Sequence, residues 1–321
     1  MTMTFTRRAA LALALAAAPG LAWAFPDKPV TLIIPFAAGG STDVVGRIVA
    51  ERMSQALGQQ VLVENVGGAG GSLGAGQAAR AEPDGYTLLM GTVATHALNP
   101  LILPQKPYDP VADFEPVSLL VIVPNVLAVN PELPVSTVQE LIDLAKEKPG
   151  ELSYASSGNG TPLHLSGELF KTMAGIEIEH VPYQGSGPAL TAVLGNHVPI
   201  IFDNLPSASA HIASGSLRAL GVTTRERAPS FPDIPAIAET LPGYETYTWN
   251  ALFAPRGTPP EVIATLNAAA VAAMADPAVA ERMKEFSAEI VASTPEELAA
   301  HVQAEVAKWT PIVADAGVAA N

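Results

Sequence analysis

The sequence predicts an α/β protein of two lobes, with the second lobe inserted in the first and a ligand cleft between the lobes. Three observations support this fold class. Short apolar, β-branched runs alternate with helical patterns after Pro26, this alternation breaks off and resumes in the middle of the chain, and several strands end in glycine-rich loops. Alternating strands and helices favour parallel sheets that helices cover on both faces.

The first block of alternation follows from hydrophobic spacing. A continuous apolar run predicts a buried strand, whereas apolar residues at every third or fourth position predict a helix. Gly58 stands where a helix is expected to end. The expected elements are strands at residues 31–36, 61–64 and 86–91, a helix at residues 44–57 and a short helix that ends at residues 77–81.

The second block repeats this pattern. Ser136 and Gln139 have the spacing of a capping box and predict a helix that ends at Lys148. Residues 217–222 form one more strand, which either stays in this block or returns to the first. The other expected elements are strands at residues 126–129, 152–155, 176–181 and 198–202 and helices at residues 162–173 and 188–194.

The C-terminal third is mainly helical. Thr258 and Thr294 are each followed by Pro and, three positions on, by Glu, which predicts two helix N-caps. The simplest architecture has chain crossings near residues 119–125 and 222–227. Residues 25–122 and 224–321 then form lobe 1, and residues 123–223 form lobe 2.

The N-terminal residues 1–24 predict export. Arg7 and Arg8 precede an apolar run, and Ala22-Trp-Ala24 gives a small-x-small cleavage site. This order is typical of a secretory signal peptide, and the run is too short to span a bilayer core of about 30 Å. The mature chain is therefore expected in the periplasm, cleaved near Ala24 and not spanning the membrane.

Charge and cysteine content exclude several classes of function. The chain has 17 basic and 31 acidic residues, a formal net charge of −14, and loss of Arg7 and Arg8 with the signal peptide makes the charge −16. A nucleic-acid partner is not expected, because phosphate binding requires a basic surface. The absence of cysteine excludes a disulfide, a lipidated N-terminal cysteine and a thiolate nucleophile. An anion site in such an acidic chain has to be local.

Four strand ends share one design, in which a loop rich in glycine, hydroxyl or amide groups leads into a helix start. Glycine lets backbone N–H groups approach a ligand, and a helix start offers unpaired N–H donors and partial positive charge, which suit a carboxylate. Each loop alone is also compatible with a plain strand-to-helix turn. Together they favour a small polar or anionic ligand, which they leave unidentified. The loops are residues 35–43, 156–162, 183–188 and 202–207.

Catalytic and metal motifs are incomplete. Residues 39–41 lack the lysine of a P-loop, and residues 74–79 lack the acidic residue that a dinucleotide site needs about 20 positions on. Gly70-x-Ser72-x-Gly74 matches the nucleophile elbow of hydrolases but lies in a glycine- and alanine-rich turn. The histidines lack the spacing of a metal site, so neither metal nor cofactor is expected. His96, near a strand end, is placed either to donate to an anion or to cap a loop.

Seven short segments, in one order along nearly the whole mature chain, are similar to a known family. The chain resembles the extracytoplasmic solute receptors of tripartite tricarboxylate transporters, the Bug family. The family usually has Gly-Gly-x-Val-Asp after Leu194, whereas this chain has Gly-Asn-His-Val-Pro, and Pro199 lacks an N–H at a strand start. The matching segments are residues 29–43, 83–88, 108–110, 156–161, 180–185, 202–204 and 254–259.

The resemblance implies a type 2 periplasmic-binding-protein fold whose lobes close over the ligand. It also implies that backbone amides, hydroxyls and bridging waters hold the ligand carboxylates. Asp203 would suit a ligand ammonium or hydroxyl, or an ordered water. The implied ligand-binding residues are Phe36, Ala37, Ala38, Gly39, Thr92 and His96 in lobe 1 and Ser157, Gly158, Thr161 and Asp203 in lobe 2.

The expected function is that of a monomeric receptor, not an enzyme. It would capture a small carboxylate (a dicarboxylate, tricarboxylate, amino acid or aromatic acid) and deliver it to the membrane subunits of a transporter. Two alternatives stay open. One is a secreted α/β hydrolase with Ser72 as nucleophile, and the other is a receptor that presents its ligand to a membrane sensor kinase.

Overall fold

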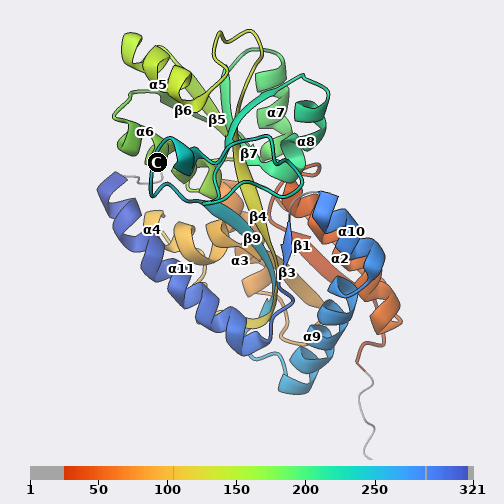
Figure 1. Cartoon of the computed structure of the whole chain (residues 1–321). Helices are drawn as coiled ribbons and strands as arrows, with labels where there is room; N and C mark the ends of the chain where they lie inside the picture. Colours follow the sequence, from red (N-terminus) through yellow and green to blue (C-terminus); the bar gives the residue numbers. More distant parts are fainter. Residues whose placement is uncertain (1–24, 104, 286–287, 317–321) are drawn as a thin grey trace, which may run out of the picture.

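The computed structural model describes residues 25–103, 105–285 and 288–316 and shows two α/β halves joined by two long strands (Figure 1). We call the half that contains β1 lobe 1 and the half that contains β5 lobe 2. The predicted signal peptide, residues 1–24, lies outside the described residues.

Lobe 1 is built on a mixed sheet in the order β2-β1-β3-β9-β4, and the short β10 lies on the other side of β4. β1 runs parallel to β2 and β3, but β9 runs antiparallel to β3 and β4, so the expectation of parallel sheets is wrong at these strands. The strands are β1 (Val30–Ile34), β2 (Val61–Asn65), β3 (Thr87–Thr92), β9 (Tyr247–Pro255) and β10 (Glu289–Ile290). The helices are α2 (Ser41–Leu57), η1 (Ala69–Gly71), α3 (Ser72–Ala79), η2 (Ala94–Leu98), α4 (Asn99–Ile102), α9 (Pro260–Met274), α10 (Pro277–Glu285) and α11 (Pro295–Ala316).

Helices cover both faces of this sheet, which explains why β1 is a continuous apolar run. Successive strand side chains point to opposite faces. Leu32 and Ile34 pack with Val49 and Leu266 of α2 and α9. Ile33 instead belongs to the cluster on the opposite face, which α3 and α11 cover. The first strand loop therefore emerges from a strand that is largely buried between two layers of helices.

Lobe 2 repeats the arrangement with the strand order β6-β5-β7-β4-β8. β6, β5 and β7 are parallel, whereas β7 and β8 run antiparallel to β4, so the strand at residues 217–222 stays in this half. The strands are β5 (Ser153–Ser156), β6 (Glu179–Pro182), β7 (Ile200–Asn204) and β8 (Arg218–Val222). The helices are α5 (Val138–Glu147), α6 (Pro162–Ala174), α7 (Ser186–Leu194), α8 (Leu205–Ala213) and η3 (Ile237–Glu239).

The lobes share the long strand β4 (Phe114–Val129). Its residues up to Pro124 pair with β9, and its residues from Asn125 onward pair with β7 and β8. The return connection lies beside the outward one, because the N–H of Thr246 donates to the carbonyl of Thr223, whose own N–H donates to Asn125. Figure 1 shows β4 and β9 running side by side from one half into the other.

The expected boundary at residues 223/224 precedes a segment, residues 224–246, that packs against lobe 2. Ile234 and Ala236 join the cluster under α7 and α8. Ile237 and Tyr244 join the cluster under α5 and α6, and the Tyr244 hydroxyl donates to the carbonyl of Ser166 at 2.8 Å. We therefore propose that lobe 2 comprises residues 125–246 and that lobe 1 comprises the residues on either side.

Two predicted helix caps are confirmed. Thr161 Oγ1 accepts from the N–H of His164 at 3.3 Å and begins α6. Thr294 and Glu297 form a reciprocal capping box before α11, with hydrogen bonds of 3.2 and 2.9 Å. These caps fix where the first turns of both helices lie.

Two other predicted caps are displaced by one residue. The cap of α5 is Thr137 rather than Ser136, because Thr137 Oγ1 accepts from Glu140 N–H while the Glu140 carboxylate accepts from Ser136 N–H. Helix α9 begins after Pro259, and the Thr258 hydroxyl donates to the carbonyl of Pro255 instead of capping the helix.

No single helix among the described residues has both the length and the apolar composition needed to cross a bilayer. The pair α9 and α10 meets both requirements only when taken together, and the two helices are bent by 68°.

Candidate ligand-binding site

A small, partly open cavity lies between the lobes, where strand ends and helix starts of both halves meet. Lobe 1 contributes the loop from β1 to α2 and the end of β3. Lobe 2 contributes the starts of α6 and α7 and the end of β7. The lining residues are Phe36, Gly40, Ser41, Thr42, Thr92, Ser157, Thr161, Pro162, Leu163, Ser186, Asn204 and Thr248.

The lining is polar but carries no charged side chain. Serine and threonine hydroxyls and the Asn204 amide provide its side-chain hydrogen-bonding groups. Helices α2, α6 and α7 begin at the cavity, so their first N–H groups and the positive ends of their dipoles face it. Thr92 Oγ1 is buried, and none of the described residues forms a hydrogen bond with it. Such a set of donors suits a small anion bound without an ion pair.

A second space of about 710 Å³ adjoins this inner cavity, and we call it the mouth. Phe36 and Ser157 line both spaces. On the lobe 1 side the mouth is lined by residues 68–71, and on the lobe 2 side by residues 157–159 and 182–184. Gly70 is needed here, because a Cβ at this position would lie 2.6 Å from the carbonyl oxygen of Asn159.

Asp43 holds the first loop in place from inside helix α2. Its carboxylate accepts from the N–H of Gly39 at 3.0 Å and from the side chains of Arg47 and Asn65. Burial raises the pKa of Asp43, but the hydrogen bonds from Arg47, Gly39 and Asn65 outweigh it and leave the pKa below its usual value. Gly39 has φ +90°, a conformation that side chains disfavour.

A chain of polar side chains crosses the base of the cleft. Ser41 Oγ in lobe 1 donates to Asn204 Oδ1 in lobe 2 at 2.7 Å. Asn204 Nδ2 donates to Asn125 Oδ1 at 2.6 Å, and the Thr248 hydroxyl donates to the same oxygen at 3.1 Å. These bonds tie both lobes to the crossing strands β4 and β9. They show the cleft in a closed arrangement.

Comparison with known proteins identifies the family. The model of the TctC family, the tripartite tricarboxylate transporter family receptor, matches residues 45–318. The chain belongs to this receptor family. Its two-lobe fold is that of periplasmic binding proteins, since periplasmic binding protein BugD is 37% identical, with a TM-score of 0.89 over 92% of this chain and 99% of BugD.

Two further solved structures contain small dicarboxylates. Rpa4515 of R. palustris, determined with adipate, is 41% identical to this TctC-family chain, with a TM-score of 0.90 over 92% of this chain and 99% of Rpa4515. MatC (Rpa3494) of Rhodopseudomonas palustris, determined with bound malate, is 35% identical, with a TM-score of 0.86 over 90% of this chain and all of MatC, 100%.

Most of the expected binding residues lie at this receptor's cleft. Phe36, Thr92, Ser157 and Thr161 line the inner cavity, and Gly158 lines the mouth. Residues 37–39 continue the loop between Phe36 and the start of α2, alongside the start of α7. Which of these residues contact the ligand stays a prediction.

Some of the expected backbone donors are used inside their own loops. The N–H of Gly39 donates to Asp43, as described above, and the N–H of Gly158 donates to Ser156 Oγ at 3.2 Å. The Thr161 hydroxyl donates to the carbonyl of Gly158 at 2.7 Å. These groups therefore shape the receptor's loops.

His96 lies in the core of lobe 1 rather than in the cavity lining. Its ring is fully buried and stacks on Phe253 with ring centroids 3.7 Å apart, and Phe114 lies at 5.0 Å. Burial lowers the pKa of His96 to about 3, so the ring is neutral at physiological pH. The aromatic packing therefore encloses the ring in this conformation, and the anion-donor role of His96 stays a prediction.

Asp203 is also set back from the cavity. It is fully buried, and Ser186 Oγ donates to its Oδ1 at 2.5 Å. Burial raises the pKa of Asp203 to about 7, although hydrogen bonds from Ser186 and the Asn204 N–H oppose that rise. Ser186, rather than Asp203, lines the cavity. The carboxyl group therefore orients the Ser186 hydroxyl.

Sequence reasoning missed the residues that connect the lobes. Ser41 and Asn204 belong to loops that the sequence singled out, but Asn125 and Thr248 lie inside β4 and β9. Their polar side chains within apolar strands are a signal that could have marked them. Ser72, the alternative nucleophile, accepts a hydrogen bond from Asn99 Nδ2 at 2.7 Å and is buried at the start of α3.

Proposed function

We propose that this protein is a periplasmic receptor that captures a small carboxylate in the cleft and delivers it to the membrane subunits of a tripartite tricarboxylate-type transporter. The family supplies the general role of a solute-binding receptor. The ligand class is inferred from the inner cavity. Both lobes line it with hydroxyl groups and helix starts, and its lining contains no charged side chain. Adipate and malate in the two similar structures support the same class.

The positions of the helix starts suggest how a ligand would span the cleft. A linear dicarboxylate with one carboxylate at the start of α2 and the other at the start of α6 or α7 would use both lobes. Closure of the lobes around it would add the contacts from lobe 2, as hinge-closing receptors do.

The decisive experiment is a binding screen of residues 25–321 by thermal shift and calorimetry. Adipate, malate, citrate and aromatic acids are compared with adipamide, which has the shape of adipate without its charge. We expect one or more acids, and not the diamide, to stabilise the fold by about 2.7 kcal/mol at 100 times the dissociation constant. Binding of adipamide or neutral sugars without any acid would refute the carboxylate assignment.

A matched pair of variants locates the site. Thr92→Val removes the buried hydroxyl that lines the cavity, and Thr265→Val makes the same change at a half-buried position of α9 that is absent from the cavity lining. We expect Thr92→Val to weaken binding of the acid that the screen selects, and we expect Thr265→Val to leave the affinity for that acid unchanged. Equal affinities for both variants would place the ligand elsewhere.

Delivery and location need separate measurements. Uptake of the labelled acid into vesicles that contain the transporter membrane subunits should require this protein. Binding without such uptake would favour presentation to a membrane sensor instead. Mass spectrometry of the exported protein should show a new N-terminus at Phe25, and sedimentation should show a monomer.

A further inference from the structure

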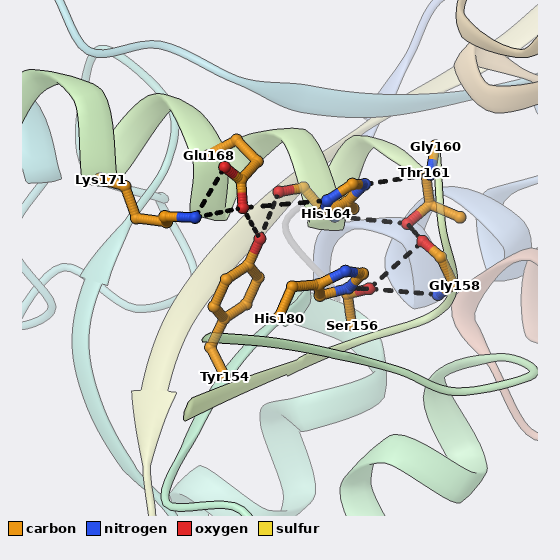
Figure 2. A network of polar contacts seen from close by, with 9 residues as sticks. All are labelled: Tyr154, Ser156, Gly158, Gly160, Thr161, His164, Glu168, Lys171 and His180. Carbon is orange, nitrogen blue, oxygen red and sulfur yellow. Dashed lines mark hydrogen bonds and ion pairs between the residues drawn. The ribbon is translucent and has the colours of Figure 1, made fainter. Parts of the chain in front are cut away.

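Two stacked histidines lie behind the loop that leads into α6. We call residues 156–161 the α6 loop. The rings of His164, in the first turns of α6, and His180, on β6, lie 3.9 Å apart between centroids and are inclined by only 12° (Figure 2). Neither ring lines the cavity, but both lie directly under the loop that does.

Each ring holds one polar atom of the α6 loop. The N–H of Gly160 donates to His164 Nδ1 at 3.1 Å, which fixes the proton of this neutral ring on Nε2. His180 Nε2 lies 2.6 Å from Ser156 Oγ. Ser156 Oγ in turn accepts from the N–H of Gly158 at 3.2 Å. Both histidines are therefore one or two hydrogen bonds away from the loop backbone.

The other side of the pair is anchored by a polar cluster (Figure 2). Glu168 Oε1 accepts from the Tyr154 hydroxyl at 2.7 Å and from Lys171 Nζ at 2.9 Å, and it lies 3.9 Å from His164 Nε2. The Tyr154 ring also packs 4.9 Å from the His180 ring. This cluster holds both imidazoles in place.

The chain leaves room for this cluster by means of a glycine. A Cβ at Gly167 would lie only 2.3 Å from the Tyr154 ring.

The two histidine rings are neutral because they are buried. Burial lowers the pKa of His164 to about 4, although Glu168 opposes this shift. Burial, together with the nearby His164, lowers the pKa of His180 to about 3. Both rings are thus neutral near pH 7, and each keeps a nitrogen that can accept a hydrogen bond.

We propose that His164 and His180 are positioning residues for ligand recognition, which hold the α6 loop in the shape that presents Ser157 and Thr161 to the cleft. This inference rests on the proposed function. Without these hydrogen bonds the loop would adopt that shape in only a fraction of the molecules. The apparent affinity for the ligand would then be reduced to that fraction of its full value. Loss of one such hydrogen bond should therefore weaken binding about fivefold or more.

Isosteric variants separate the hydrogen bond from the bulk of the ring. His164→Asn keeps an acceptor near the position of Nδ1, and His164→Leu removes it. His180→Gln and His180→Met form the same kind of pair for Nε2. His197→Leu, at an exposed histidine of lobe 2, is the control for loss of a histidine. Calorimetry and stopped-flow binding of adipate, or of the acid that the screen selects, are measured at pH 7.5.

We expect His164→Leu and His180→Met to raise the dissociation constant at least fivefold, mainly through faster dissociation. His164→Asn and His180→Gln should stay within about threefold of the wild type, and His197→Leu should not change it. Folded Leu and Met variants with wild-type affinity would overturn the proposal. So would Asn and Gln variants that bind as weakly as the Leu and Met variants.

Nitrogen NMR of the unmodified protein tests the same idea without a variant. His164 should show the Nε2–H tautomer, and the Gly160 amide should exchange slowly with solvent. An Nδ1–H tautomer for His164 would overturn the proposal even if the Leu variant failed to fold. Failure of the wild type to bind any acid would instead refute the proposed function, so the two failures are distinguishable.

Discussion

Ser41→Ala offers the sharpest test of lobe closure, because it removes a buried hydroxyl that donates to the opposite lobe at the cleft base. Ser41 Oγ donates to Asn204 Oδ1 at 2.7 Å, and these residues are 1% and 6% exposed. In an open cleft water would solvate both groups. The substitution therefore penalises the closed state and leaves the open state almost unchanged.

The expected magnitude follows from burial. A buried polar group that loses its partner costs about 1–3 kcal/mol. Asn204 Oδ1 is the group left behind, while its Nδ2 still donates to Asn125 at 2.6 Å. Since each 1.4 kcal/mol is a factor of ten, the dissociation constant should rise between about fivefold and a hundredfold. The midpoint of unfolding without ligand should change less than this.

Calorimetry gives the affinity, and small-angle scattering with and without ligand gives the degree of closure. Ser54→Ala is the control, since Ser54 lies on the same helix α2 and its Oγ donates to the carbonyl of Ala50 within lobe 1. A double-mutant cycle with Asn204→Ala measures the coupling of the pair. A Ser41→Ala protein with unchanged affinity and unchanged closure would refute the reasoning.

Three other predictions follow from caps and buried groups. Thr161→Ala and Thr137→Ala each remove a helix cap and should lower the free energy of unfolding by about 1 kcal/mol. Only Thr161→Ala should also weaken ligand binding. Equal ligand affinities of the two variants would count against a role of the α6 start. Burial lowers the pKa of His96 from 6.5 to about 3. The contribution of the neutral ring to the free energy of unfolding is therefore complete above pH 6.5, and it falls by up to about 1.4 kcal/mol per pH unit as the pH drops toward 3. In urea unfolding at several pH values, His96→Phe should flatten this slope, and an unchanged slope would contradict the assignment. Glu305 accepts from the indole N–H groups of Trp249 and Trp309 and from the hydroxyl of Tyr247, so Glu305→Leu should destabilise the fold by about 3 kcal/mol or more and Glu305→Gln by less, as measured by thermal unfolding.

Local sequence patterns were sufficient for most elements and for the general place of the site. The apolar run of β1, the spacing of α2 with Gly58 after it, and the Thr161 cap of α6 each depend on neighbours a few positions away in the chain. The four strand-to-helix loops could be located for the same reason. Their order also made the family recognisable, as the match to residues 45–318 confirms.

Local patterns were least informative where contacts between distant segments decide the environment of a residue. Residues 224–246 carry no local sign of their lobe, and only packing of Ile237 and Tyr244 against lobe 2 decides it. His96 follows a strand end as a ligand residue would, yet Phe253, more than 150 positions later, encloses its ring. Asp203 lies behind Ser186, whose hydroxyl donates to its carboxylate, so that Ser186 rather than Asp203 lines the cavity.

Short-range patterns thus predicted the strands, the helix starts and the chemical character of the loops, because hydrophobic period and capping act over a few residues. Which polar groups face the cleft, and which are used within the protein, depends instead on contacts between distant segments of the folded chain. Ser41 meets Asn204 across 163 positions of chain, and such a pair exists only once both lobes have folded and closed. Side-chain burial and hydrogen-bond partners are properties of that assembled arrangement.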